Sequence, residues 1–102
     1  MIPNAERHLE MLRSMQTIRR FEERASDDYV SGSIYGVVHC YIGEEAVAVG
    51  ACAALRDDDY ITGNHRSHGH YLSLTDDVHS LFAETLGKVT GASKGMGGSM
   101  HV

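Results

Sequence analysis

The sequence predicts an α/β protein in which helices outweigh strands. Apolar residues recur at spacings of three and four after Asn4 and again over residues 76–86, and this period indicates two amphipathic helices. Residues 44–55 are almost all small and apolar, which favours a third helix. Residues 60–62, Tyr-Ile-Thr, are typical of a short buried strand. With a further helix beginning near residue 67, the expected order is helix, helix, strand, helix, helix.

The first helix is expected to begin after Asn4, whose side chain can cap it, and to end at Ser31 and Gly32. One stripe of apolar residues follows the helical repeat: Leu9, Leu12, Met15, Ile18, Phe21, Ala25 and Tyr29. A helix of about 25 residues is long for a small domain. We therefore expect part of this stripe to pack on something that the chain does not supply.

The second helix should be buried, because residues 46–55 have almost no polar face. Glu44 and Glu45 stand in its first turn, where the helix dipole favours negative charge. Small residues at Ala46, Gly50 and either Ala53 or Ala54 form a ridge that would let another helix approach closely.

The last two helices are predicted from their ends. Residues 67–74 begin one helix, and Thr75 is expected to cap the other over 76–86, with Gly87 closing it. Its predicted inner face consists of Val78, Leu81, Phe82, Thr85 and Leu86. Residues 91–101, the glycine loop, show no periodicity.

Length and charge limit what the protein can be. A chain of 102 residues with 42% hydrophobic residues supports one domain at most. Nine basic against fourteen acidic residues give a net charge of −5, which argues against nucleic acid or an anionic membrane as a partner. The sequence offers no targeting segment or membrane span, and Cys40 and Cys52 are expected to stay reduced, so we expect a cytoplasmic protein.

Three imidazoles and a guanidinium crowd into residues 64–70, directly after the predicted strand. His65, His68 and His70 could ligate zinc, or they could merely hydrogen-bond backbone carbonyls. The glycine at position 69 argues for an irregular backbone there. Arg66 favours a third interpretation, because its planar fork binds phosphate oxygens in pairs. We expect an anion clamp and no metal site.

The glycine loop carries Lys94-Gly95-Met96-Gly97-Gly98-Ser99-Met100-His101, a backbone that can approach a ligand closely. It is not a Walker loop, because the Gly-Lys-Ser/Thr ending is missing and no strand precedes it. Alone it is equally typical of a flexible linker. Together with residues 64–70 it indicates a phosphate-bearing cofactor. A glycine loop just before Val102 leads us to expect that the chain is a piece of a longer protein.

Four blocks together resemble the alpha subunit of thiamine-diphosphate-dependent 2-oxo acid dehydrogenases, with the pyruvate and acetoin types nearest. The blocks are MQTIRRFE at 15–22, GVVHCYIGEEAVAVG at 36–50, HRSHGH at 65–70 and KGMGGSMH at 94–101. The resemblance implies a three-layer thiamine-diphosphate-binding fold with a mostly parallel sheet. Residues 1–102 would be the helix-rich N-terminal portion of that single domain, with the rest absent.

The resemblance also implies roles for five residues. His39, His65 and Arg66 would bind the cofactor, with Arg66 gripping its diphosphate. Many relatives carry tyrosine in place of His65, so this chain departs from the pattern there. His68 and His101 match histidines near the mouth of the active site, and are the catalytic candidates for substrate orientation or proton transfer.

The implied reaction is decarboxylation of pyruvate or another 2-oxo acid, or cleavage of acetoin, with the carbon fragment passed to a lipoyl group. The implied partners are a beta subunit in a heterotetramer and a lipoyl-bearing acyltransferase component. Magnesium would accompany thiamine diphosphate, but its Gly-Asp-Gly and Asn ligands are expected outside this chain. We therefore expect the chain alone to be inactive and to bind the cofactor weakly. The alternatives are a histidine-based metal-binding module and a non-catalytic interaction fragment.

Overall fold

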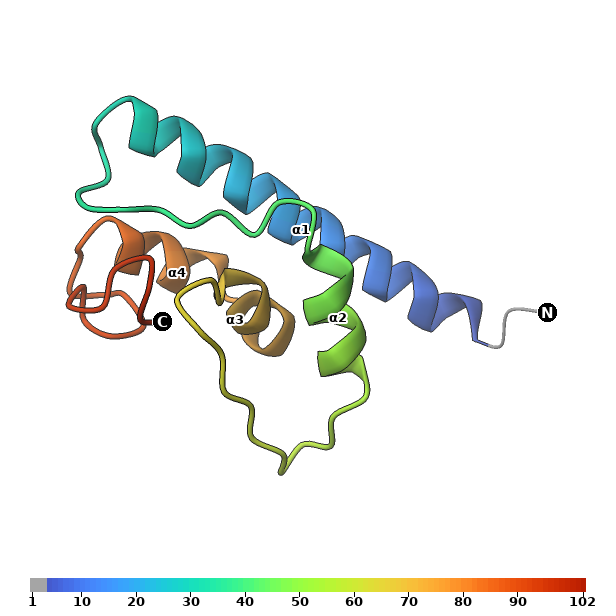
Figure 1. The fold of residues 1–102 in the computed structure, drawn as a ribbon. Helices are drawn as coiled ribbons and strands as arrows, with labels where there is room; N and C mark the ends of the chain where they lie inside the picture. The colour runs from blue at the N-terminus through green and yellow to red at the C-terminus, as the bar shows by residue number, and fades with distance from the viewer. Residues whose placement is uncertain (1–3) are drawn as a thin grey trace.

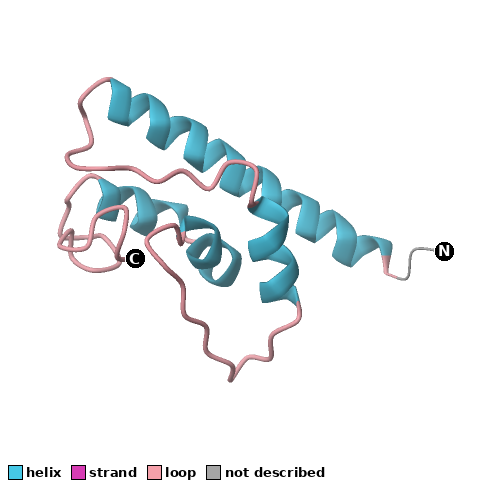
Figure 2. Ribbon diagram, viewed as in Figure 1, coloured by secondary structure: helices cyan, strands magenta, loops and turns pink. Residues whose placement is uncertain are grey.

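The computed structural model describes residues 4–102, which form four helices joined by irregular segments (Figure 1). They are α1 (Ala5–Val30), α2 (Glu45–Ala53), α3 (His68–Thr75) and α4 (Val78–Thr85). The described part contains no strand (Figure 2). The strand predicted at 60–62 is therefore wrong, and Tyr60 is 96% exposed. A lone extended segment has no neighbour to complete its backbone hydrogen bonds, so it remains a loop.

Helix α1 confirms the predicted cap and end. The Asn4 side chain accepts a hydrogen bond from the backbone N–H of Arg7 at 3.1 Å, and the chain turns away at Gly32, whose φ is +83°. The predicted stripe is only partly covered. Ile18, Phe21 and Ala25 lie in the core, whereas Leu9, Leu12 and Tyr29 at the two ends are exposed.

Helix α2 is not buried as predicted. Only Glu45, Ala48 and Val49 are buried, and Val47 is 67% exposed. The small-residue ridge does not receive another helix, since a Cβ added at Gly50 would meet nothing within 4 Å. The reason is geometric: α2 packs with one face on α1 and α3, and nothing in the described chain covers its other face.

The first turn of α2 is tied to α1 through a carboxylate. Glu45 pairs with the guanidinium of Arg19 and also accepts the backbone N–H of Gly43 at 2.9 Å. The hydrogen bond from Arg19 lowers the pKa of Glu45, against the opposing effect of burial. A negative charge here is therefore stabilised by a side chain as well as by the helix dipole.

Helix α3 begins as predicted, but Gly69 has a different purpose from the one the sequence indicated. It lies within regular helix, and a Cβ there would stand 2.5 Å from the Tyr41 ring and 3.0 Å from the Ala48 side chain. Glycine therefore permits close packing of α3 on α2 and on the segment before it. The predicted irregular backbone at this position is wrong.

Helix α4 is capped by Asp77 rather than by Thr75. The Asp77 side chain accepts the N–H of Ser80 at 2.9 Å, while Thr75 ends α3 and its hydroxyl accepts the N–H of Asp77 at 3.1 Å. The inner face is as predicted, with Leu81 and Thr85 buried. The ring of Phe82 packs on Phe21 of α1, with 4.3 Å between centroids.

The four helices share one core that lies beneath α1. It consists of Ile18, Phe21, Ala25, Ile34, Tyr41, Ala48, Val49, Leu72 and Leu81. Figure 1 shows the segment after α1 running back along that helix, and the glycine loop coiled beside α4. Within residues 4–102, no helix combines the length and apolar character that crossing a membrane requires.

Candidate functional site

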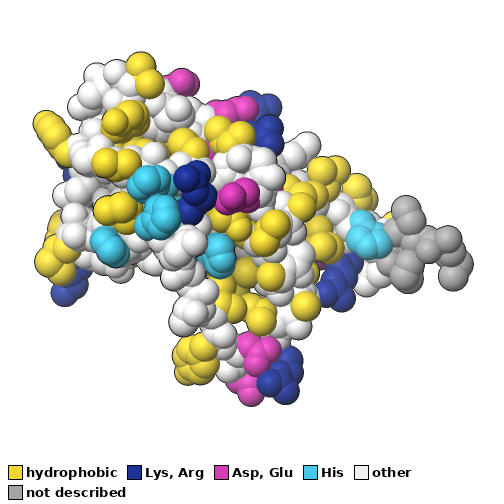
Figure 3. Space-filling view, viewed as in Figure 1, with side chains coloured by type: hydrophobic (Ala, Val, Ile, Leu, Met, Phe, Trp, Pro, Cys, Tyr) yellow, Lys and Arg dark blue, Asp and Glu magenta, His cyan; other side chains and the backbone are white. Residues whose placement is uncertain are grey.

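Two irregular segments meet to form a basic edge. The guanidinium of Arg66, just before α3, donates from Nη1 to the backbone carbonyl of Cys40 in the segment before α2. The rings of His39 and His65 meet edge to face, with 4.6 Å between centroids. We call His39, His65 and Arg66 the arginine edge. Figure 3 shows histidine side chains gathered beside a basic side chain on this face of the molecule.

Arg66 is held in place but not neutralised. Its backbone N–H donates to the side-chain oxygen of Asn64 at 2.9 Å, which fixes the turn before α3. Within residues 4–102, no carboxylate forms an ion pair with its guanidinium. An arginine carries five N–H donors, and the bond to Cys40 uses only one nitrogen of the fork. The remaining donors are suited to an anion with several oxygens.

The arginine edge repels further positive charge. The pKa of His39 lies below its usual value, first because partial burial disfavours the charged ring, and then because His65, Arg66 and His68 are nearby. A lowered pKa favours neutral imidazole at neutral pH. His39 can therefore accept a proton or a hydrogen bond in this position.

His68 lies in the interior rather than on the arginine edge. Its ring is fully buried, with Nδ1 at 2.7 Å from Glu22 Oε1 of α1. Its Nε2 lies 2.9 Å from the Ser99 hydroxyl and 3.0 Å from the Ser99 carbonyl oxygen. This acid–imidazole–hydroxyl order resembles a serine-hydrolase triad. Burial keeps substrates away from it, so we interpret it as a fixed link between α1, α3 and the glycine loop.

This geometry argues against the zinc alternative. Both ring nitrogens of His68 are engaged by protein groups, which leaves none for a metal. Among residues 4–102, no three His, Cys, Asp or Glu side chains converge so that they could hold a metal ion. Cys40 and Cys52 are free thiols.

The backbone of the glycine loop binds an anion of the protein itself, the carboxylate of Glu84. The carboxylate of Glu84 accepts backbone N–H bonds from Ser93, Gly95, Gly97 and Gly98, at 2.7 to 3.0 Å. The expectation that this backbone would approach the cofactor's phosphate is therefore wrong for these four N–H groups. The loop is also not a flexible linker.

His101 joins the arginine edge through a shared cleft. A hollow of about 390 Å³ is lined by Gly63, Asn64, His65, Ser67, Met100, His101 and Val102. Of the five predicted site residues, His65 and His101 line this cleft. His39 adjoins it through its ring contact with His65, and Arg66 follows His65 in the chain. His68 supports the region from within.

A family model matches this chain. The model for the dehydrogenase E1 component covers residues 13–102. The chain belongs to this family. It is 48% identical over 95% of its length to the alpha subunit of acetoin:2,6-dichlorophenolindophenol oxidoreductase of Bacillus subtilis, of which it covers 29%. It is 51% identical over 92% of its length to the alpha subunit of the pyruvate dehydrogenase E1 component of Zymomonas mobilis, of which it covers 27%. The chain therefore spans less than a third of these relatives.

Three supporting residues of this E1 component sequence were not predicted: Glu22, Glu84 and Ser99. Glu22 stands on the buried stripe of α1 beside Phe21, and Glu84 on the inner face of α4 between Leu81 and Thr85. A charged residue within an apolar stripe can be seen in the sequence. It indicates a structural role, because a buried charge needs a partner. Ser99 gives no such signal, since serine is ordinary in a glycine-rich loop.

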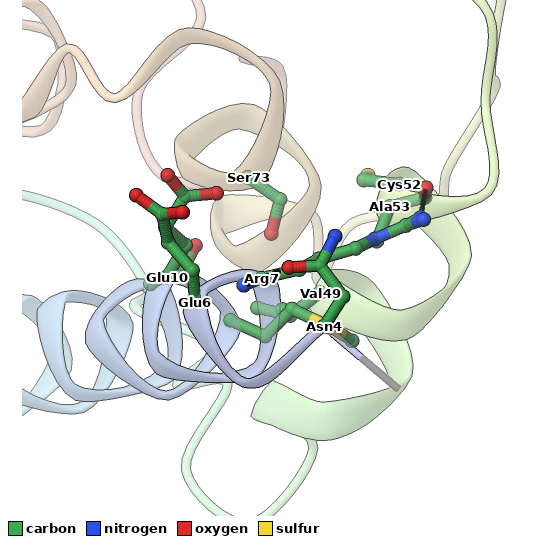
Figure 4. Close-up of a pocket in the computed structure, with 10 residues that line it drawn as sticks. Asn4, Glu6, Arg7, Glu10, Val49, Cys52, Ala53 and Ser73 are labelled. Carbon is green, nitrogen blue, oxygen red and sulfur yellow. Dashed lines mark hydrogen bonds between the residues drawn. The ribbon is translucent and has the colours of Figure 1, made fainter. Parts of the chain in front are cut away.

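A larger hollow lies away from these residues. It measures about 620 Å³ and is lined by Asn4, the cap of α1, and by residues of α1, α2 and α3 that include Glu10, Val49 and Ser73 (Figure 4). Arg7 reaches across it to the carbonyl oxygen of Ala53. None of the five predicted site residues lines it. Size alone therefore does not identify the functional region here.

Proposed function

We propose that the chain is the N-terminal part of the alpha subunit of a thiamine-diphosphate-dependent 2-oxo acid dehydrogenase. The enzyme would decarboxylate pyruvate or cleave acetoin, and pass the acyl or hydroxyalkyl fragment to a lipoyl carrier. The observation that carries the proposal is the arginine edge, where a guanidinium that pairs with no carboxylate of residues 4–102 stands beside two imidazoles. The names of the relatives, which are pyruvate dehydrogenase and acetoin oxidoreductase alpha subunits, support the same substrates.

The arginine edge fits a diphosphate. Phosphate oxygens accept paired N–H bonds from a guanidinium. The pKa of His39 is lowered first by burial and then by His65 and Arg66, and a bound anion would offset the charge of Arg66. We infer that Arg66 holds the diphosphate and that His39 and His65 contact the cofactor beside it. Thiamine diphosphate supplies a ring that stabilises the carbanion left by decarboxylation. Magnesium would be held by residues outside this chain.

The two catalytic candidates take different roles in this proposal. His101 is exposed in the cleft beside His65, where an imidazole can orient a substrate or transfer a proton. His68 acts indirectly, because its buried ring holds Ser99 two residues before His101. We propose His68 as a positioning residue for this segment.

The remaining features of the enzyme are also proposals. Residues 1–102 would complete, with later residues, one three-layer domain that has a mostly parallel sheet. A beta subunit would form a heterotetramer with this subunit, and a lipoyl-bearing acyltransferase would receive the product. The exposed Leu9 and Leu12 of α1 and the open face of α2 support packing against further protein. The free thiols of Cys40 and Cys52 support a cytoplasmic location.

The test is Arg66→Ala in the full-length subunit assembled with its partner. Losing a bond to a charged group should raise the cofactor concentration at half-maximal activity about 10- to 100-fold. Arg66→Lys should recover part of the loss, because lysine keeps the charge but not the fork. Arg20→Ala, which removes an exposed arginine of α1, is the control. Unchanged cofactor dependence in Arg66→Ala would contradict the role of Arg66, and a wild-type assembly without cofactor-dependent activity would favour the non-catalytic interaction fragment.

A further inference from the structure

Glu84 is a buried charge for which the proposed reaction has no direct use. It stands in the last turn of α4 with none of its surface exposed. Its Oε2 accepts the N–H groups of Ser93 and Gly95, at 2.7 and 2.8 Å. Its Oε1 accepts those of Gly97 and Gly98, at 2.7 and 3.0 Å. Each oxygen thus has two donors.

This arrangement requires a carboxylate. Burial alone would raise the pKa of Glu84, but the four backbone N–H bonds outweigh burial and leave the pKa below its usual value. A glutamine of the same shape would offer one oxygen and turn an NH₂ group toward two N–H donors. Glutamine is therefore a nearly isosteric substitution that removes the function of Glu84.

The glycine loop is shaped around this carboxylate. A Cβ at Gly91 would lie 2.5 Å from Glu84 Cα, so only glycine fits there. Lys94 and Gly95 have φ of +56° and +77°, a region that non-glycine residues rarely adopt. The N–H bonds to Glu84 hold the loop in this conformation.

Two of the residues that donate to Glu84, Ser93 and Gly97, also contact the backbone of His101. The Ser93 hydroxyl donates to the His101 carbonyl oxygen at 3.3 Å. Gly97 packs so closely on His101 that an added Cβ would come within 3.1 Å of its carbonyl carbon and closer still to its carbonyl oxygen. Two of the four donors therefore connect Glu84 directly to the backbone of His101.

We propose that Glu84 is a positioning residue, which fixes the glycine loop so that His101 faces His65 across the cleft. The loop is preformed by an internal anion, and no ligand is needed to order it. The inference rests on the proposed function only in taking this cleft as the mouth of the reaction site. The position of His101 can be tested separately from the reaction.

The first test uses the 102-residue chain and nuclear magnetic resonance. In Glu84→Gln, the amide protons of Ser93, Gly95, Gly97 and Gly98 should exchange about 10- to 100-fold faster, since each loses a bond to a charged group. The resonances of His101 should move, while those of His39 should stay. Glu23→Gln, which makes the same change at an exposed glutamate of α1, should change none of these exchange rates or resonances. Unchanged exchange and an unchanged His101 in Glu84→Gln would overturn the proposal.

Gly97→Ala provides a second variant if Glu84→Gln does not fold. It keeps the carboxylate but pushes on the His101 backbone, so the His101 resonances should move while the amide proton of Ser93 stays protected from exchange.

In the assembled enzyme, Glu84→Gln should lower kcat about 10- to 100-fold, because misplaced groups catalyse poorly. The cofactor concentration at half-maximal activity should stay within about twofold, because Arg66 is held by Cys40 and not by the loop. Equal fold-changes in kcat and in the cofactor concentration at half-maximal activity would contradict a positioning role. An inactive wild-type assembly would overturn the proposed function, but the exchange result would still decide the role of Glu84.

Discussion

The two sides of the cleft are held by different forces. The glycine loop is fixed by a buried carboxylate with four N–H partners, in bonds that need nothing from outside the chain. The arginine edge is fixed by one side-chain bond from Arg66 to Cys40 and one backbone bond to Asn64, and the charge of Arg66 disfavours a further positive charge on His39. One side includes its own anion, whereas among residues 4–102 no carboxylate pairs with the guanidinium on the other side.

This difference separates what stabilises the fold from what binds a ligand. Removing the internal anion should cost stability, because buried donors lose their partners. Removing the positive charge of Arg66 should cost little stability but much affinity for a diphosphate. Measuring both the free energy of unfolding and the affinity for a diphosphate therefore shows whether a charged residue mainly stabilises the fold or mainly binds the ligand.

The largest expected effect is on the free energy of unfolding in Glu84→Ala. Four buried N–H groups would lose a charged acceptor, which should cost about 3 to 5 kcal/mol. Arg66→Ala should cost less than about 1 kcal/mol, because its bond is at the edge of the fold. Urea unfolding of the 102-residue chain, followed by circular dichroism, measures both. Similar losses in the two variants would erase the proposed distinction.

The acid dependence of this effect has a definite sign. Because the pKa of Glu84 is lowered in the fold, its contribution is present above the carboxyl's unfolded pKa and is lost as pH falls through the folded pKa. The stability difference between the wild type and Glu84→Gln should therefore shrink in acid. Unfolding curves at neutral and acidic pH provide the measurement, and a difference that grows in acid would contradict the account.

A pair of glycine variants gives the next largest effect. Gly97→Ala should cost about 2 kcal/mol, because the new methyl group would press on the His101 backbone. Gly50→Ala should gain about 1 kcal/mol, because α2 has open space there and alanine favours helix. Thermal unfolding of both variants compares them directly. A stabilised Gly97→Ala would show that the glycine loop is looser than described.

Ser99→Ala should have a smaller effect, of about 1 kcal/mol, because one hydrogen bond to His68 is removed. The remaining partner of Nε2 is then the carbonyl oxygen of residue 99, which can only accept. Nε2 of His68 should therefore carry a proton in the variant. Nitrogen-15 resonances of the His68 ring report which nitrogen is protonated, and an Nε2 without a proton in Ser99→Ala would refute this.

The smallest expected effect is a change in the titration of His39. Its pKa is lowered by partial burial, then by His65 and Arg66, so Arg66→Ala should move the pKa of His39 upward. The lowered pKa opposes folding once His39 is protonated, so its penalty appears as pH falls below the ring's unfolded pKa. Proton resonances of the His39 ring across neutral pH measure the shift. A downward shift in Arg66→Ala would contradict the electrostatic account.

The sequence predicted where the helices lie along the chain better than it predicted their burial and their contacts. The period of α1 and the cap at Asn4 are local features, and both are confirmed. The burial predicted for α2 and the strand at 60–62 failed because both depend on neighbours that residues 4–102 do not provide. Gly69 and Glu84 act through contacts with residues distant in sequence, so a local pattern could not identify the partners of either residue.

The candidate site was predicted in part. The proximity of His39, His65 and Arg66 follows from blocks that resemble one family, and the structure brings them together. The sequence could not show that His68 would turn inward to Glu22, since that depends on how α3 meets α1. Nor could it show that the glycine loop would bind Glu84 rather than a phosphate.

The most direct test is the structure of the assembled enzyme with thiamine diphosphate bound. The account predicts a guanidinium nitrogen of Arg66 at about 2.8 Å from a diphosphate oxygen, with the four N–H groups of the glycine loop still on Glu84. A guanidinium that faces solvent or a carboxylate, far from any phosphorus atom, would contradict it.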